Sequence, residues 1–166
     1  MKALVLFILF LNSCAEFTPL YENKKIFLEN LKDATILTDN KKMSQSIKKN
    51  LLKKMPPSNN NIKFIIKIET EIENNSTVTS TDRKTSGYEI VTNAIVSLYK
   101  RDKYDKLIFS FKEISVVPYE LSPNQVLSTL ASRNRVFDRS SIKLSKSILD
   151  RLMLYFSKIN YNDNKG

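Results

Sequence analysis

The sequence has no histidine, no tryptophan and a single cysteine, Cys14, among its 166 residues. Without imidazole or a second thiol, the chain cannot assemble Cys/His or Ser/His/Asp catalytic sets or a zinc cluster. Only two glycines are present, so a glycine-rich phosphate-binding loop is also missing. Most hydrolases and metalloenzymes are thereby excluded. We expect a non-enzymatic protein without a cofactor, whose role is binding or assembly.

Positive charge is plentiful: 27 Lys and Arg stand against 17 Asp and Glu, a formal net charge of +10. Such an excess attracts polyanions, which include nucleic acid, anionic lipid and phosphorylated glycolipid. A lysine-rich surface that is simply solvated explains the same composition. Glu69, Glu71 and Glu73 form the nearest acidic group, which could bind a cation but more simply forms a solvated strand face.

An apolar run of about nine residues begins at Leu4, with one positive side chain, Lys2, ahead of it. A helix that spans a bilayer needs about 20 apolar residues, so the run predicts a processed export signal. Export also argues against nucleic acid as a partner.

Cys14 closes this run in the segment Leu11-Asn12-Ser13-Cys14, which resembles the lipobox of bacterial lipoproteins. The resemblance implies that residues 1–13 are a lipoprotein signal peptide and that Cys14 carries diacylglycerol and acyl chains, which anchor the protein stably in a membrane. Ala15 follows the cysteine in place of aspartate, which in such lipoproteins favours the outer membrane. The alternative is an apolar N-terminal strand with a buried free thiol.

Hydrophobic periodicity predicts the element order β-α-β-β-β-α. Residues 22–32 are interpreted as an irregular entry segment, and Arg101 to Lys106 as a charged turn. A bulge is expected near Lys112 or Glu113, because the apolar residues of the third hairpin strand change parity there. The expected strands are Ala34–Thr38, 62–73, 88–99 and 107–116; the expected helices are Lys41–Met55, ended by Pro56-Pro57, and a helix of about 35 residues from Val126.

These elements predict an α+β fold in which two helices pack on one face of a mixed four-stranded sheet. A single domain would cover residues 14–166, with a frayed tail from about residue 160. In the first helix, Met43, Ile47 and Leu51 form an apolar stripe among many lysines. That helix could lie on an anionic membrane, or pack on the sheet with its lysines in solvent.

Four segments stand out in the order of the chain: Phe17-Thr-Pro-Leu-Tyr21 after the cysteine, Gly87-Tyr-Glu-Ile90, Ser97-Leu-Tyr99 and the helix around 127–133. Together they resemble the lipopolysaccharide-assembly lipoprotein family LptE, in its alphaproteobacterial branch. The resemblance implies a lipid-anchored outer-membrane protein with an LptE-like α/β sandwich domain. It further implies a plug within the outer-membrane β-barrel LptD and a role in inserting lipopolysaccharide into the outer leaflet.

Lipid A carries phosphates, so basic groups at hairpin ends are candidates for glycolipid contact. Arg83 and Lys84, at the expected tip of the first hairpin, are the first choice, and Arg101, Lys103 and Lys106 are the second. Ordinary solvated turn charges are the alternative. For the whole chain, the competing function is a lipoprotein subunit of a lipid-trafficking ABC transporter.

Overall fold

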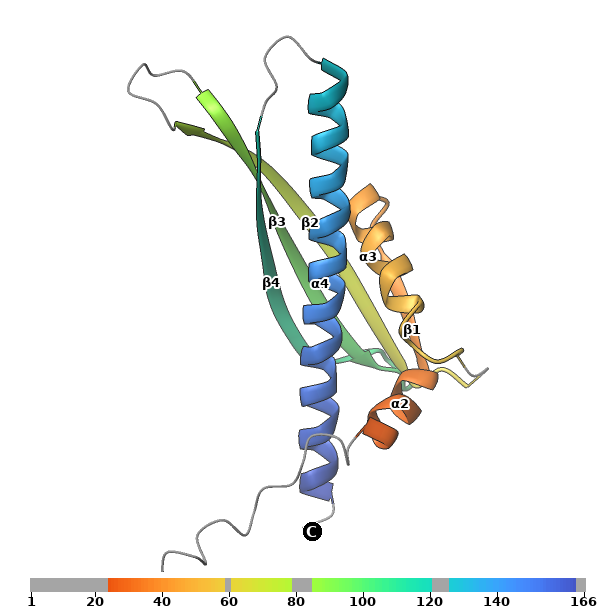
Figure 1. Ribbon diagram of the computed structural model, residues 1–166. Coiled ribbons are helices and arrows are strands. Elements are labelled where there is room, and N and C mark those ends of the chain that lie inside the picture. Colours follow the sequence, from red (N-terminus) through yellow and green to blue (C-terminus); the bar gives the residue numbers. More distant parts are fainter. Residues whose placement is uncertain (1–23, 59–60, 79–84, 121–125, 164–166) are drawn as a thin grey trace, which may run out of the picture.

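The computed structural model describes residues 24–58, 61–78, 85–120 and 126–163. These residues form one sheet with helices on one face, as predicted from the sequence (Figure 1). In the sheet order β1-β2-β3-β4, β1 is parallel to β2 and the other neighbours are antiparallel. The elements are α2 (Lys24–Lys32), β1 (Ala34–Thr38), α3 (Lys42–Leu52), β2 (Phe64–Val78), β3 (Thr85–Lys100), β4 (Lys106–Glu120) and α4 (Val126–Asp163).

The strand alternation read from the sequence is confirmed in β2 and β3. Ile66 and Ile68 of β2 are fully buried against the helices, while Lys67 and Glu69, which alternate with them, are exposed on the other face. In β3, Val96 and Leu98 point to the same buried side. Successive side chains of a strand point to opposite faces, so this pattern gives the sheet one helix-covered face and one uncovered face.

α3 confirms the first predicted helix. Of the two arrangements considered for it, on an anionic membrane or on the sheet, the structure shows packing on the sheet. Met43, Ile47 and Leu51 are each 0% exposed and contribute to the core. Because this stripe is already buried against β1, β2 and α4, it cannot enter a bilayer. The lysines of α3 therefore lie outside the buried stripe, and of the large apolar residues of this helix Leu52 alone is exposed.

Residues 24–32 correct the expectation of an irregular entry segment, because they form the helix α2. Phe27 and Leu31, one helical turn apart, are 5% and 0% exposed, and α2 contacts α4. The described part of the chain thus has three helices, one more than predicted. The segment Phe17-Thr-Pro-Leu-Tyr21, which carries part of the resemblance, lies outside the described residues.

The predicted bulge near Lys112 or Glu113 is wrong. The β3–β4 pairing runs without a break from Gly87 opposite Glu120 to Leu98 opposite Phe109, and the register shifts only between Leu98 and Tyr99. The change of apolar parity has another cause: Glu113 stays on the helix-facing side, and Ile114 is 53% exposed on the uncovered face.

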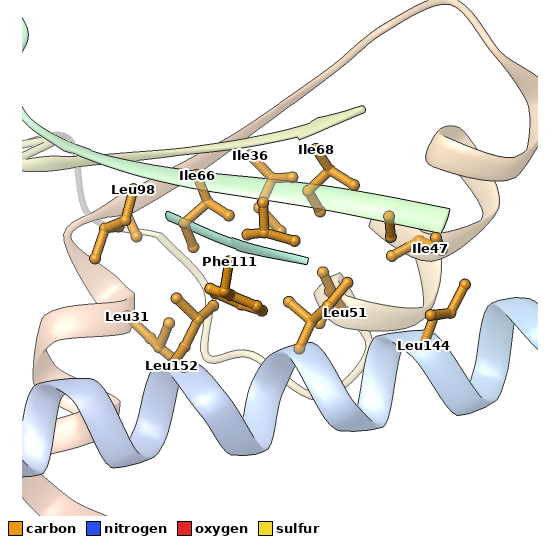
Figure 2. Close-up of a cluster of buried hydrophobic side chains, with 14 of the residues drawn as sticks. Leu31, Ile36, Ile47, Leu51, Ile66, Ile68, Leu98, Phe111, Leu144 and Leu152 are labelled. Carbon is orange, nitrogen blue, oxygen red and sulfur yellow. The ribbon is translucent and has the colours of Figure 1, made fainter. Parts of the chain in front are cut away.

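The core lies between the sheet and the three helices, and Figure 2 shows Leu144 and Leu152 of α4 directed toward Ile66, Ile68 and Phe111 of the strands. Full burial of one such side chain contributes about 1.5–3 kcal/mol. α4 extends to Asp163, a few residues beyond the predicted start of a frayed tail. No helix in the described part of the chain is both long and apolar enough to span a bilayer.

Two interruptions of the apolar stripe on α4, Ser140 and Ser141, are buried in the interior. The Ser140 hydroxyl donates to Thr92 Oγ1 of β3 at 3.2 Å, and the Ser141 hydroxyl accepts from Asn50 Nδ2 of α3 at 3.1 Å. These hydrogen bonds satisfy polar groups that would otherwise be costly to bury. The two serines therefore join α4 to α3 and to the sheet.

Candidate binding surfaces

The described residues contain no group of three or more acidic or cysteine side chains placed to hold a metal ion. Glu69, Glu71 and Glu73 all lie on the uncovered face of β2 and are exposed. Glu69 pairs with Lys67 at 2.8 Å between Oε1 and Nζ. This is the solvated strand face that the sequence favours over a cation site.

The predicted contact residues fall into two groups with different outcomes. Cys14, Arg83 and Lys84 lie outside the described residues. Arg101, Lys103 and the neighbouring Lys106 are described, and the β3–β4 turn brings them together with all three exposed. This turn, residues 101–105 with Lys100 and Lys106 at its ends, is called the basic turn below.

The basic turn lies at one end of the sheet, beside the start of β2, because Arg101 N donates to Lys63 O at 2.7 Å. Val78 and Thr85, the described residues that flank Arg83 and Lys84, lie at the other end of the β2–β3 hairpin. Sixteen residues of β3 separate the two ends, about 50 Å at the usual rise per residue. The basic turn and the described residues that flank Arg83 and Lys84 therefore lie at opposite ends of the β2–β3 hairpin.

Within the basic turn, Asp102 and Asp105 offset part of the positive charge. Asp102 Oδ1 accepts from the backbone N–H of Lys103 at 2.8 Å, which shapes the turn. Tyr104 is 80% exposed at its apex. Exposed cations of this kind can bind a phosphate at little desolvation cost. A turn that is simply solvated would carry the same exposed charges.

The uncovered face of the sheet carries both polar and apolar side chains. Ile95 of β3 and Ile114 and Val116 of β4 are 39%, 53% and 45% exposed on this face. The acidic row of β2 runs beside them, with Glu71 opposite Asn93 and Asn93 opposite Ile114. An exposed apolar strip bordered by charged residues is typical of a protein contact surface.

An ion pair that the sequence did not predict fixes α4 to the edge strand β4. Arg151 Nε of α4 pairs with Oε1 of Glu113, and the Ser147 hydroxyl donates to Oε2 of the same carboxylate at 2.7 Å. The Arg151 guanidinium also lies over the ring of Phe111, 5.6 Å from its centroid. Phe109, Phe111 and Glu113 follow one another at intervals of two residues, so strand alternation places their side chains on the same face. This spacing in the sequence could have predicted the inward position of the Glu113 carboxylate.

A second polar junction holds the start of α3. Asp39 accepts hydrogen bonds from the Lys41 and Thr70 backbone N–H groups, each at 3.3 Å, and Lys41 Nζ donates to Thr70 O at 2.6 Å. Burial raises the pKa of the Asp39 carboxyl, but the hydrogen bonds from Ser44, Thr70 and Lys41 and the charge of Lys41 outweigh it and lower that pKa below its usual value. Asp39 thus connects the residue before α3 to β2, while Lys41, at the N-cap position, makes no side-chain capping hydrogen bond.

Comparison with known proteins gives matches in structure only. No known family matches the sequence, and no curated protein does. A provisionally described lipoprotein of Caulobacter crescentus CB15 superposes with a TM-score of 0.59 at 12% identity, covering 80% of this chain and 96% of that one.

Two further solved structures have the same fold. Rare lipoprotein B from Shewanella oneidensis gives a TM-score of 0.53 at 12% identity over 79% of this chain and 98% of that one. An uncharacterized lipoprotein B from Nitrosomonas europaea gives 0.56 at 13% identity over 75% and 83%. At such low identity the matches establish the fold, and the described part of this chain has the α+β fold seen in these bacterial lipoproteins.

Proposed function

We propose that this chain is a lipid-anchored, non-enzymatic assembly factor of the outer membrane that binds an LptD-like β-barrel and assists the insertion of lipopolysaccharide. The observation that carries the proposal is the fold shared with rare lipoprotein B across nearly the whole of that protein. It agrees with the LptE-like order of sequence segments. Cys14, at the end of a signal-like run, supplies the anchor.

The uncovered sheet face supports a protein partner of this kind. The inside of an outer-membrane barrel is polar, so a plug needs exposed groups that hydrogen-bond and pair with charges. The row Glu69, Glu71 and Glu73 provides such groups, and the neighbouring Ile114 and Val116 provide apolar contact. The proposal therefore places the barrel wall against the uncovered face of the sheet. The other face stays covered by α2, α3 and α4, with the core between them and the sheet.

The proposed function is tested by purifying the tagged full chain from membranes of its own host. We expect a large outer-membrane β-barrel to copurify with it, identified by mass spectrometry. Cys14→Ser should release most of the protein from membranes washed at high salt, because the acyl anchor is lost. Copurification with an inner-membrane ATPase complex would instead support the ABC-transporter subunit, and a Cys14→Ser protein that stays membrane-bound would contradict lipidation.

Direct contact with glycolipid phosphate is a separate prediction. We expect Arg83→Gln/Lys84→Gln to weaken lipopolysaccharide binding about tenfold, since two charge contacts contribute about 0.5–1 kcal/mol each. Lys103→Gln/Lys106→Gln tests the basic turn in the same assay, a titration with fluorescent lipopolysaccharide.

Lys143→Gln/Lys146→Gln, which removes two exposed charges from α4, serves as the matched control. Equal binding by the wild type and by both hairpin-end variants would show that these residues are ordinary turn charges.

A further inference from the structure

The edge strand β1 has one side without a partner strand in the described part of the chain. On its other side, Phe64 N donates to Asp33 O at 3.0 Å, and Asp39 N donates to Ile68 O at 3.3 Å. Backbone groups alternate in direction along a strand, so those of Ala34, Ile36 and Thr38 point away from β2. β1 thus offers N–H and C=O groups that can pair with another strand.

A groove runs along this free edge beneath α3. One hollow of about 570 Å³ lies between Thr38 and the helix, and another of about 550 Å³ lies beside Ala34, Thr35 and Ile36. Lys48 and Leu52 of α3 line both hollows. The groove therefore follows β1 from its first residue to its last, which is enough length to receive a strand of comparable size.

The walls of this groove are basic and partly apolar. Lys48, Lys49 and Lys53 line it, and no aspartate or glutamate of the described residues does. None of these three lysines forms an ion pair with another described residue. Leu52 beside them is 53% exposed, and Leu37 of β1, which lies opposite Lys67 on the uncovered face next to the groove, is 50% exposed. A ligand here would need negative charges and some apolar side chains.

We propose that this groove binds an extended acidic peptide segment of a partner protein, which adds to β1 as a fifth strand. In such strand addition, main-chain hydrogen bonds supply affinity, and alternate side chains supply specificity. Acidic side chains on the helix side of the peptide would face Lys48, Lys49 and Lys53. The apolar side chains that alternate with them would lie on the uncovered face, beside Leu37. An anionic lipid surface could neutralise the lysines, but it has no row of amides to pair with the strand edge inside the groove.

The proposal does not depend on the proposed barrel partner, because the groove lies at the β1 edge and on the helix side. Its test uses the full chain in detergent and a fluorescent peptide of alternating Glu and Val, followed by anisotropy. We expect saturable binding, weakened about tenfold or more by Lys48→Glu/Lys49→Glu. Lys143→Glu/Lys146→Glu on α4, which reverses the same number of exposed charges, should leave the affinity unchanged.

A peptide of the same sequence, N-methylated at every second residue on its pairing edge, separates strand addition from charge attraction. It keeps all the carboxylates but cannot donate main-chain hydrogen bonds to β1, so we expect its binding to be lost. This arm uses the wild-type protein and is unaffected by any folding defect of the variants. Equal binding of the methylated peptide, or equal binding by the Lys48/Lys49 variant, would overturn the proposal.

Vesicles of phosphatidylglycerol test the competing anionic ligand. If they bind the wild type in a manner that depends on Lys48 and Lys49 while the Glu-Val peptide does not bind, the groove is a membrane-contact site and the proposal is wrong. Lack of vesicle binding together with peptide binding supports it. Neither result bears on copurification with a barrel, so failure here is distinguishable from failure of the proposed function.

Discussion

Phe156→Ala is expected to lower the free energy of unfolding by about 3–5 kcal/mol, as is usual when a buried phenylalanine is truncated. Phe156 is 2% exposed near the C-terminal end of α4. Its ring lies 5.2 Å from that of Phe64 in β2, edge to face, and 6.4 Å from that of Phe27 in α2. The substitution would therefore loosen the junction of three elements at once.

The loss is measured by urea unfolding of the full chain, followed by circular dichroism. Small domains are stable by only about 5–15 kcal/mol, so the midpoint should fall markedly. Leu154→Ala is the matched control, because Leu154 lies on the same helix and is 45% exposed; its effect should stay within about 0.5 kcal/mol. Equal effects of the two substitutions would show that the end of α4 does not pack as described.

Arg151→Ala is expected to destabilise the fold by about 2–3 kcal/mol, because it leaves a largely buried carboxylate without its positively charged partner. The Glu113 side chain is 12% exposed, whereas that of Arg151 is 52% exposed, which keeps the effect below that of a fully buried pair. After the substitution, Ser147 remains as the partner of Glu113. Loss of the guanidinium from the face of Phe111 adds to the effect.

The origin of this loss is tested by adding Glu113→Gln. In the Arg151→Ala background, the neutral amide should recover about 1 kcal/mol or more, since the uncompensated charge is gone. In the wild-type background, the same Glu113→Gln should be destabilising, because it weakens an existing ion pair. Arg139→Ala, at another exposed position of α4, is the control for removing an arginine. Additive effects of the two substitutions would contradict an interaction between Glu113 and Arg151.

Much of the architecture follows from local patterns. Ala34–Thr38 is a short, β-branched run and forms β1 with the predicted bounds. The four-residue recurrence of Met43, Ile47 and Leu51 placed α3, and strict alternation placed β2 and the buried side of β3. Each of these signals lies within a single element, where the periods of 3.6 and 2 are set by backbone geometry.

The features that the sequence did not predict correctly are those whose surroundings are formed by residues distant in the sequence. Glu113 led to the prediction that the apolar residues of β4 change face, because an inward carboxylate is unfavourable without partners. Its partners, Arg151 and Ser147, lie on α4. Ser140 and Ser141 interrupt the apolar stripe of α4, and their hydrogen-bond partners Thr92 and Asn50 lie in other elements. The helix α2 depends on two large residues, Phe27 and Leu31, in a short segment, and its stability comes from packing against α4.

The candidate binding surfaces likewise combine features that the sequence predicts with features that only the tertiary structure shows. The sequence by itself predicted acylation of Cys14, and it indicated the lack of histidine and of a second cysteine and the basic residues of the turns, because these depend on residue type and near neighbours. Only the tertiary structure separated the basic turn from the far end of the β2–β3 hairpin. It also placed Lys48 and Leu52 over the free edge of β1. Both results depend on which strand lies at the sheet edge and which helix packs beside it, and long-range pairing decides that.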